Sequence, residues 1–429
     1  MTDSSDQRPP FPPDEPSSTT PPTRDDLVDV DRACDAVFRT DDLEADLPRR
    51  SVRSGAVIVG SQAVSFGFTM IGIAILARLL TPDDFGLVEM VIVFLMLVQT
   101  FQEMGLGEST IQQPTITHRQ ISTLFWVNTG IGFIGAAVMA LLAWPIAWFF
   151  ERPELVGVTL ALSTTFILAG LVAQHVALLR RRMRFGVVSV IYVSARVFSL
   201  VVAVVAALLG AGYWALVLMR IGFAVGLLVG SWSSVGWMPG PPGPIREVGA
   251  MLRFGGYLAG AKFTDALVRT FDRMLIGRLQ TAEMLGQYSK AYQLLMLPVV
   301  QLNTPITTVA VPTLSRLQDD PERFRLYYQR GIEIIAAMTF PIVFGCLAAA
   351  ETIILGLLGD QWGPAVPLFR ALAPASLFVA LSVSTDWVFV SLGQTDRQFR
   401  WRLVASLLIV SAFLIGAAYA LAQGVDLSV

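Results

Sequence analysis

The sequence predicts an all-α integral membrane protein made of two parallel helical lobes. Hydrophobic residues make up 54% of the 429 residues and charged residues only 15%, whereas about one quarter of the residues in an average soluble domain are charged. From residue 55 onward, apolar runs recur that are long enough to cross a hydrocarbon core of about 30 Å. The second half of the chain also repeats features of the first half. We therefore expect two pseudo-symmetric six-helix lobes, the second one helix short, that line a cavity between them.

The first 50 residues predict a disordered tail on the cytoplasmic side of the membrane. They are rich in Pro, Ser, Thr and Asp and lack sustained apolar periodicity, so they cannot bury enough apolar surface to offset the entropy of ordering. A signal peptide would show a positively charged region, a short apolar stretch and a cleavage site. The first apolar run here starts too late and is too long for a signal peptide.

Eleven apolar segments are predicted to cross the membrane. They are 55–79, 86–105, 122–149, 155–178, 186–209, 212–235, 251–278, 284–311, 329–357, 365–391 and 400–422. Arginine is concentrated in alternate connections, as in RRRMR at 180–184, and the remaining connections are short and poor in arginine. Because arginine-rich connections stay in the cytoplasm, this pattern predicts a multi-pass protein of the cytoplasmic membrane with its N-terminus inside.

An internal repeat with an offset of 200 residues relates the two halves. LARLLTPDDFGLVEM at 76–90 aligns with IGRLQTAEMLGQYSK at 276–290. Both copies are predicted to end one helix, turn outside the membrane and begin the next, and six helices separate them, so they point the same way. The resulting organisation is a tail at 1–50, a first lobe at 51–236, a Pro/Gly-rich linker at 237–249 and a second lobe at 250–429.

Ionised residues lie inside the apolar segment 251–278. At 3.6 residues per turn, one face of the expected helix carries Lys262, Asp265, Arg269, Asp272 and Arg273. A charge that faces lipid is costly, so this stripe is expected to face a protein interior or a water-filled cavity. The repeat counterparts of Lys262, Asp265 and Arg269 on the first helix are polar but uncharged: Gln62, Ser65 and Thr69. Both equivalent helices are therefore expected to line the cavity, and the charge on the second favours a functional role.

Two interpretations of the stripe stay open. Its members are spaced three or four residues apart and can neutralise one another as a structural ladder. Alternatively, its three cations exceed its two anions, and an anionic ligand would balance the surplus, since arginine is suited to bidentate phosphate contacts. Among other polar residues in the spans, Arg220, Lys290 and Glu333 are interpreted as snorkelling or as partners in surface ion pairs. Arg196 and Asp386 are left open.

Three prolines follow one face of segment 284–311 and its end, at intervals of seven residues: Pro298, Pro305 and Pro312. Each removes a backbone hydrogen bond and kinks a helix. The pattern predicts either a static curve or a bending element that gates access to the cavity.

Several function classes are excluded by what the sequence lacks. There is no phosphate-binding Gly-rich loop, no HExxH and no CxxC, and the short outer connections leave no room for the acidic residues of a membrane glycosyltransferase or polymerase. Cys34 and Cys346 offer neither a disulfide framework nor metal-ligand spacing. A formal net charge of -2 provides no basic surplus for nucleic acid. We expect that the protein is not an enzyme and that it has no cofactor, metal site or nucleic-acid partner.

The motifs taken in order resemble a known family. They are LARLLTPDDFGLVEM at 76–90, FQEMGLGESTIQQ at 101–113, Phe125 and Trp126 with Asn128, GAGYWALV at 210–217, and FDRMLIGRL with LGQYSKAYQL within 271–294. Over residues 50 to 422 the chain resembles the polysaccharide flippases, of the O-antigen and teichuronic-acid type, of the multidrug/oligosaccharidyl-lipid/polysaccharide exporter superfamily.

The resemblance implies a V-shaped transporter that moves a polyprenyl-pyrophosphate-linked oligosaccharide across the membrane by alternating access. Arg269 and Arg273, with Lys262, would contact the pyrophosphate, and Asp265, Asp272 and Asp386 would orient them or take up a coupling ion. Polysaccharide polymerases and glycosyltransferases are the expected partners. Such relatives have twelve to fourteen helices, so eleven predict a truncated sequence. A cation-coupled drug or metabolite antiporter of the same fold and a non-transporting membrane scaffold are the alternatives; a positive cavity favours the flippase and an acidic one the antiporter.

Overall fold

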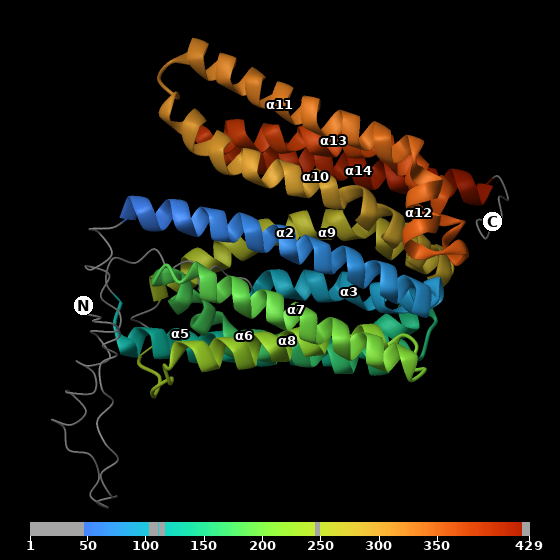
Figure 1. Ribbon diagram of the computed structural model, residues 1–429, viewed down its shortest axis with the longest axis horizontal. Helices are drawn as coiled ribbons and strands as arrows, with labels where there is room; N and C mark the ends of the chain where they lie inside the picture. The colour runs from blue at the N-terminus through green and yellow to red at the C-terminus, as the bar shows by residue number, and fades with distance from the viewer. Residues whose placement is uncertain (1–46, 103–109, 111–115, 245–248, 423–429) are drawn as a thin grey trace, which may run out of the picture.

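The computed structural model describes residues 47–102, 110, 116–244 and 249–422 (Figure 1). Within these ranges every regular element is helical, which confirms the predicted all-α class. The expected tail lies outside the described residues up to residue 46, and the first helix begins at Leu47. Of the expected linker, residues 237–244 have no regular secondary structure and 245–248 lie outside the description.

The predicted segments correspond to long helices. Those of the first half are α2 (Leu47–Leu79), α3 (Pro82–Gln102), α5 (His118–Phe150), α6 (Leu155–Arg181), α7 (Phe185–Leu208) and α8 (Trp214–Val235). Those of the second half are α9 (Gly249–Leu279), α10 (Ala282–Arg316), α11 (Pro321–Ala348), α12 (Ala350–Leu358), the 3-10 helix η3 (Asp360–Trp362), α13 (Ala365–Ser391) and α14 (Thr395–Ala422). In the described part of the chain, nine of these helices are long and apolar enough to cross a membrane. The chain is therefore a multi-pass membrane protein.

One predicted segment is wrong in its extent. The sequence predicts a single helix over 329–357, but α11 ends at Ala348 and α12 begins at Ala350. Ala349 between them has φ −95° and ψ 16°, and its N–H donates to the Gly345 carbonyl as in a helix C-terminus. With nine residues, α12 is about 13 Å long, too short to span the membrane.

Residues matched by the repeat begin two helices in the same way. Thr81 precedes α3, and its Oγ1 accepts a hydrogen bond from the Asp84 N–H at 3.3 Å. Thr281 caps α10, and its Oγ1 accepts from the Met284 N–H at 3.2 Å. Each threonine satisfies an N–H that the first helical turn leaves without a partner. The shared cap explains why both copies turn from one helix into the next after the same number of residues.

The helices gather into two groups with α2 and α9 between them (Figure 1). Within the first group α5 packs on α6 and α7 on α8, and within the second α10 and α11 pack on α13. The groups meet chiefly where α3 contacts α9 and α10. The connections at 80–81, 151–154, 209–213, 280–281 and 359–364 lie at one end, which we call the closed end. The opposite end, with the connection at 182–184, is called the arginine-rich end.

Two glycines bring α3 and α10 into close contact at the closed end. A Cβ on Gly86 would lie 1.7 Å from the Ala282 carbonyl oxygen, and a Cβ on Gly286 would lie 1.9 Å from the Pro82 carbonyl oxygen. No side chain larger than hydrogen fits at either position. Gly86 and Gly286 are also repeat counterparts, and their mutual contact is the arrangement that a pseudo-two-fold axis between α3 and α10 would produce.

Candidate functional site

A cavity of about 690 Å³ lies among α2, α3, α6, α7 and α8, with α10 closing one side; we call it the large cavity. Its lining on α6 runs from Leu162 to Arg180, which is about 27 Å of helix. Because Arg180 lies in the last turn of α6, the large cavity extends to the arginine-rich end. It is long enough to lead from that end into the middle of the molecule.

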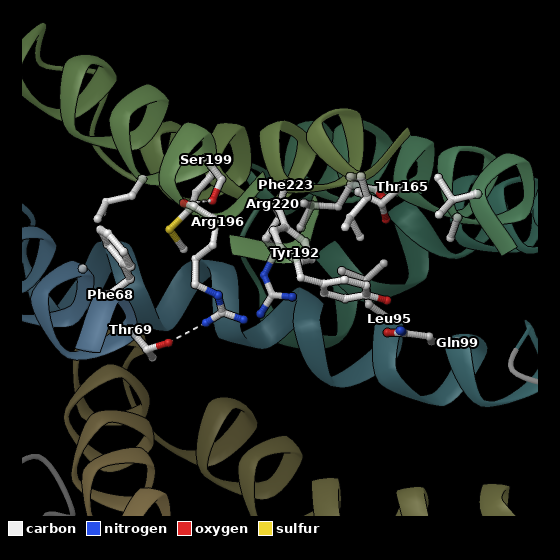
Figure 2. A pocket seen from close by; sticks show the side chains of 18 of the residues that line it. Phe68, Thr69, Leu95, Gln99, Thr165, Tyr192, Arg196, Ser199, Arg220 and Phe223 are labelled. Atoms are coloured by element: carbon white, nitrogen blue, oxygen red, sulfur yellow. Dashed lines mark hydrogen bonds between the residues drawn. The ribbon is translucent and has the colours of Figure 1, made fainter. Parts of the chain in front are cut away.

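The charged residues that line the large cavity are basic. They are Arg180, Arg196, Arg220 and Lys290, and among the described residues no Asp or Glu lines it. Arg196 on α7 and Arg220 on α8 direct their guanidinium groups into the same space (Figure 2). An Arg196 Nη1–H donates to the Thr69 hydroxyl of α2, and its guanidinium carbon lies 5.7 Å from the centre of the Phe223 ring.

Small residues bring the two arginine-bearing helices together. The Cβ position of Gly226 on α8 lies 2.9 Å from Ala195 Cα on α7, and that of Gly222 lies 3.6 Å from Ser199 Cα. Close backbones of this kind are typical of helix pairs in membranes. Arg196 directly follows Ala195 and Arg220 lies two residues before Gly222, so the same packing seats both cations at the wall of the cavity.

A second cavity of about 410 Å³, the small cavity, lies between the two helix groups and is lined by α3, α8, α9 and α10. Arg220 and Lys290 line both cavities. Arg220 is surrounded by protein, yet much of its surface is exposed because it faces the empty space of the cavities. The Lys290 ammonium donates to Gln293 Oε1 at 2.8 Å and lies 4.3 Å from the centre of the Phe85 ring.

Arg273 on α9 and Glu89 on α3 form an ion pair in the small cavity. Their Nη1 and Oε1 atoms are 3.0 Å apart, and their side chains are only 14% and 18% exposed. The Arg273 guanidinium also lies 5.3 Å from the centre of the Tyr292 ring. Glu89 is close enough to attract Arg220 and Lys290 as well.

Arg196, Arg220, Arg273 and Lys290 together form a cationic cluster, supplied by α7, α8, α9 and α10 in turn. Four cations against the one carboxylate of Glu89 leave three positive charges. Lys290 is repelled by both Arg220 and Arg273. A surplus of positive charge inside a membrane protein is costly without an anion or water to compensate it. The geometry therefore suits an anionic ligand.

The structure distributes the predicted charged stripe over different places. Arg273 belongs to the cationic cluster. Arg269 is exposed and attracts Asp386 of α13. Asp386 also accepts a hydrogen bond from Gln398 at 2.8 Å and forms an ion pair of 2.7 Å with Arg402 of α14.

The remaining members of the stripe are Asp272, Lys262 and Asp265. Asp272 is buried, accepts a 2.7 Å hydrogen bond from the Tyr288 hydroxyl and lines neither cavity. The side chains of Lys262 and Asp265 lie outside the described residues.

The uncharged counterparts are also separated. Thr69 lines the large cavity and contacts Arg196. Gln62 is exposed, and neither it nor Ser65 lines the cavities, although the Ser65 carbonyl accepts from the Thr69 hydroxyl at 2.8 Å. The helix α10 runs without interruption through Pro298, Pro305 and Pro312. Their proposed gating role stays a prediction.

Sequence reasoning missed the centre of the site. Arg220 and Lys290 were interpreted as snorkelling residues or partners in surface ion pairs but line the walls of both cavities, and Glu89 was not singled out. The sequence does contain a signal for these three residues, because they lie at a similar distance from the helix starts at one end of the molecule. Glu89, Arg220 and Lys290 follow the starts of α3, α8 and α10 by six to eight residues, and all three helices start at the closed end. Charged residues about two turns inside three such helices predict a shared layer.

The fold is that of known membrane transporters. A structure described as "Lipid II flippase MurJ, inward closed conformation" matches with a TM-score of 0.66 and 12% identity, over 83% of this chain and 79% of the other. An inward-facing multidrug resistance MATE family transporter of the MOP superfamily matches with a TM-score of 0.57 and 12% identity, over 80% of this chain and 84% of the other. At such identities the likeness shows the fold alone.

The family is shown by the sequence itself. The family described as "Polysaccharide biosynthesis protein" matches residues 75–367, and the chain belongs to it. The lipopolysaccharide biosynthesis protein WzxC of Escherichia coli is 25% identical over 370 residues, covering 85% of this chain and 74% of WzxC. The succinoglycan biosynthesis transport protein ExoT of Rhizobium meliloti is 26% identical over 83% of this chain and 72% of ExoT. The teichuronic acid biosynthesis protein TuaB of Bacillus subtilis is 27% identical over 71% of this chain and 63% of TuaB.

Proposed function

We propose that this protein flips a polyprenyl-pyrophosphate-linked oligosaccharide across the cytoplasmic membrane for the synthesis of a cell-surface polysaccharide. Its family, its transporter fold and its relatives WzxC, ExoT and TuaB support this function. The cationic cluster carries the proposal, because a pyrophosphate supplies the negative charge that the cluster lacks.

The size and chemistry of the cavities fit the polar part of such a substrate. A volume of about 690 Å³ falls within the usual range for a small-molecule site, about 300–1,000 Å³. It accommodates the pyrophosphate and the first sugars, and the polyprenyl chain stays in the bilayer. Arginine binds phosphate oxygens through two parallel N–H groups, and Arg196 and Arg220 present two guanidinium groups to one space (Figure 2).

The direction of transport follows from the arginine distribution. The connection with Arg182 and Arg184 lies at the end to which the large cavity extends, and connections rich in arginine stay in the cytoplasm. This supports an N-terminus on the inside and a described state whose cavity is reached from the cytoplasmic side. Export then requires α3 and α10 to separate at the closed end.

The sign of the charge separates flippase from antiporter. A cation-coupled drug antiporter needs carboxylates in its cavity that are free to bind a cation. Among the described residues, Glu89 is the one carboxylate that lines either cavity, and four cations outnumber it; Asp272 lines neither. The protein acts as a carrier without catalysing a covalent step. Glycosyltransferases supply its substrate on the cytoplasmic side, and a polymerase consumes the product outside.

The test replaces the two cations shared by both cavities. We expect Arg220→Gln and Lys290→Gln each to reduce polysaccharide export at least about tenfold, since each removes one charge contact with the pyrophosphate. Surface polysaccharide is measured in cells that lack the native gene, at matched amounts of protein in the membrane. The control is Arg370→Gln, whose side chain is 51% exposed and forms a 3.6 Å ion pair with Glu351.

Normal export by both cavity variants would overturn the proposal. Loss of export together with loss of the protein from the membrane would instead support the scaffold alternative. Binding of farnesyl pyrophosphate to the purified full-length protein separates the two hypotheses: a flippase binds it and loses affinity in Arg220→Gln and Lys290→Gln, whereas a scaffold shows no binding that depends on these residues.

A further inference from the structure

Resting on the proposed function, we infer that the small cavity is a second anion subsite, in which the Glu89 carboxylate occupies the place of a substrate phosphate on Arg273. The large cavity receives the pyrophosphate from the cytoplasmic side. The small cavity takes it over next to the closed end, and the substrate must displace Glu89 to enter.

Two hydrogen-bonding groups in the small cavity lack partners. Arg273 and Ser289 both line this cavity. Within them, Arg273 Nε and Ser289 Oγ are buried and have no hydrogen-bond partner among the described residues. Buried polar groups without partners are rare and call for an explanation. Ser289 is only 7% exposed. An oxygen-rich anion in the cavity would satisfy both groups.

Glu89 satisfies only part of what Arg273 offers. Its Oε1 lies 3.0 Å from Arg273 Nη1, which leaves the Nε–H of the same guanidinium without a partner. Carboxylates and phosphates are both bidentate ligands of arginine, so the two compete for the same donor. A pyrophosphate has more oxygens and more charge than one carboxylate, and can contact Arg220 and Lys290 at the same time.

The order of the cations along the molecule provides a path. Arg196 lines only the large cavity, Arg273 only the small one, and Arg220 and Lys290 line both. A pyrophosphate can therefore leave Arg196 for Arg273 without losing the two shared cations. The small cavity also borders Phe85 and Val88, which lie one residue before and two residues after Gly86 of the α3–α10 contact, so its occupant lies next to the closed end.

Displacing Glu89 links binding to opening. The pair Glu89–Arg273 joins α3 of the first group to α9, which lies between the groups, near the closed end. When the substrate takes Arg273, this ion pair is lost at the moment when α3 must move away. A ligand shifts a conformational equilibrium only through different contacts in the two states, and the exchange of Glu89 for phosphate provides that difference.

The repeat supports a specific role for Glu89. Its counterpart in the second lobe is Ser289, and both residues line the small cavity. The first lobe thus supplies an anion where the second supplies a neutral hydroxyl. A pair of hydroxyls would serve packing equally well, so the carboxylate is the feature that the proposed exchange explains.

The decisive variant is Glu89→Gln, which keeps the shape and removes the charge. We expect farnesyl pyrophosphate to bind the purified full-length protein about tenfold more tightly, since the competing anion is gone, while polysaccharide export falls. A variant that is only damaged in its folding would lose both its affinity for farnesyl pyrophosphate and its export activity. Glu351→Gln, which removes a carboxylate with 67% exposure from its pair with Arg370, is expected to change neither quantity.

A second variant locates the effect. In an Arg273→Gln background, Glu89→Gln is expected to give no gain in affinity, because the two residues act on the same contact. Unchanged affinity of Glu89→Gln, or an undiminished gain without Arg273, overturns the second subsite. Either result leaves the proposed function intact, since that rests on loss of export by Arg220→Gln and Lys290→Gln.

Discussion

The closed end and the cationic cluster lie about two helical turns apart and treat charge in opposite ways. At the closed end two ion pairs match one cation with one carboxylate each: Arg278 pairs with Glu151 at 2.8 Å, and Arg152 with Asp83 at 3.6 Å. In the cluster four cations share one carboxylate. Paired charges hold helices together and need nothing further. The excess positive charge of the cluster is balanced only when an anion binds. We therefore assign a structural role, holding helices together, to the ion pairs of the closed end and a ligand-binding role to the cluster.

The repeat shows the same division. Thr81 and Thr281 both cap helices, and Gly86 and Gly286 contact each other. Between and after these two matches the copies differ: Glu89 aligns with Ser289, and Met90 with Lys290. The capping threonine and the contact glycine are kept, whereas Glu89 and Lys290, which are proposed to act on the substrate, have no charged counterpart. Full symmetry of the lobes stays a prediction. At these positions a symmetric pair of glycines allows the close contact between α3 and α10.

The largest expected effect comes from breaking the contact at the closed end. Gly86→Ala places a Cβ 1.7 Å from the Ala282 carbonyl oxygen, a distance that no real contact allows, so α3 and α10 must separate. We expect export to fall at least about tenfold, because alternating access needs both ends to close. The control is Gly60→Ala, where a Cβ would meet nothing within 4 Å.

Thiol labelling can show the separation directly. A Leu297→Cys probe lines the small cavity and is placed in a background with Cys34→Ser and Cys346→Ser. Gly86→Ala should raise its labelling by a membrane-impermeant reagent from outside the cell several-fold. Unchanged labelling and normal export would mean that the glycine contact is not the barrier at the closed end.

A smaller effect is expected from one hydrogen bond across the closed end. Trp362 is fully buried, and its Nε1–H donates to the Ala77 carbonyl at 2.9 Å. Trp362→Phe removes this donor and should lower the stability by about 1 kcal/mol, seen as a drop of a few degrees in the Tm of the purified protein. Trp148→Phe, at a side chain that is 82% exposed, should leave the Tm unchanged. Equal shifts in both variants would show that the bond contributes nothing.

Much of the fold was predictable from the sequence, because apolar runs and breaks directly report membrane crossings. The predicted segment 365–391 agrees with α13 at both ends, whereas 329–357 concealed the break at Ala349, since three alanines span it and only Glu351 and Thr352 interrupt the apolar run. The site was harder to predict. A helical stripe groups residues along one helix, but the cluster takes one cation from each of four helices, and only packing reveals which faces converge.

That limitation explains the fate of the predicted stripe. Arg273 reaches the cluster, but Arg269, four residues earlier on the same face, is exposed and attracts Asp386. Asp272 turns to the Tyr288 hydroxyl of α10 instead. Single-helix geometry cannot show these partners, because each one comes from another helix. The common depth of Glu89, Arg220 and Lys290 was the better signal, since equal distances from one membrane face survive any rotation of the helices.

The smallest effect is expected from an ion pair of the closed end. Arg278 and Glu151 are 45% and 70% exposed, and exposed pairs contribute about 0–1 kcal/mol. Arg278→Gln should therefore keep export within about twofold of the unmodified protein, in contrast to the same substitution at Arg220. Export assays on both variants, at matched protein amounts, test the comparison between the two regions. A loss of export in Arg278→Gln as large as in Arg220→Gln would show that a charge at the closed end is essential for transport. The distinction between structural ion pairs and ligand-binding cations would then be wrong.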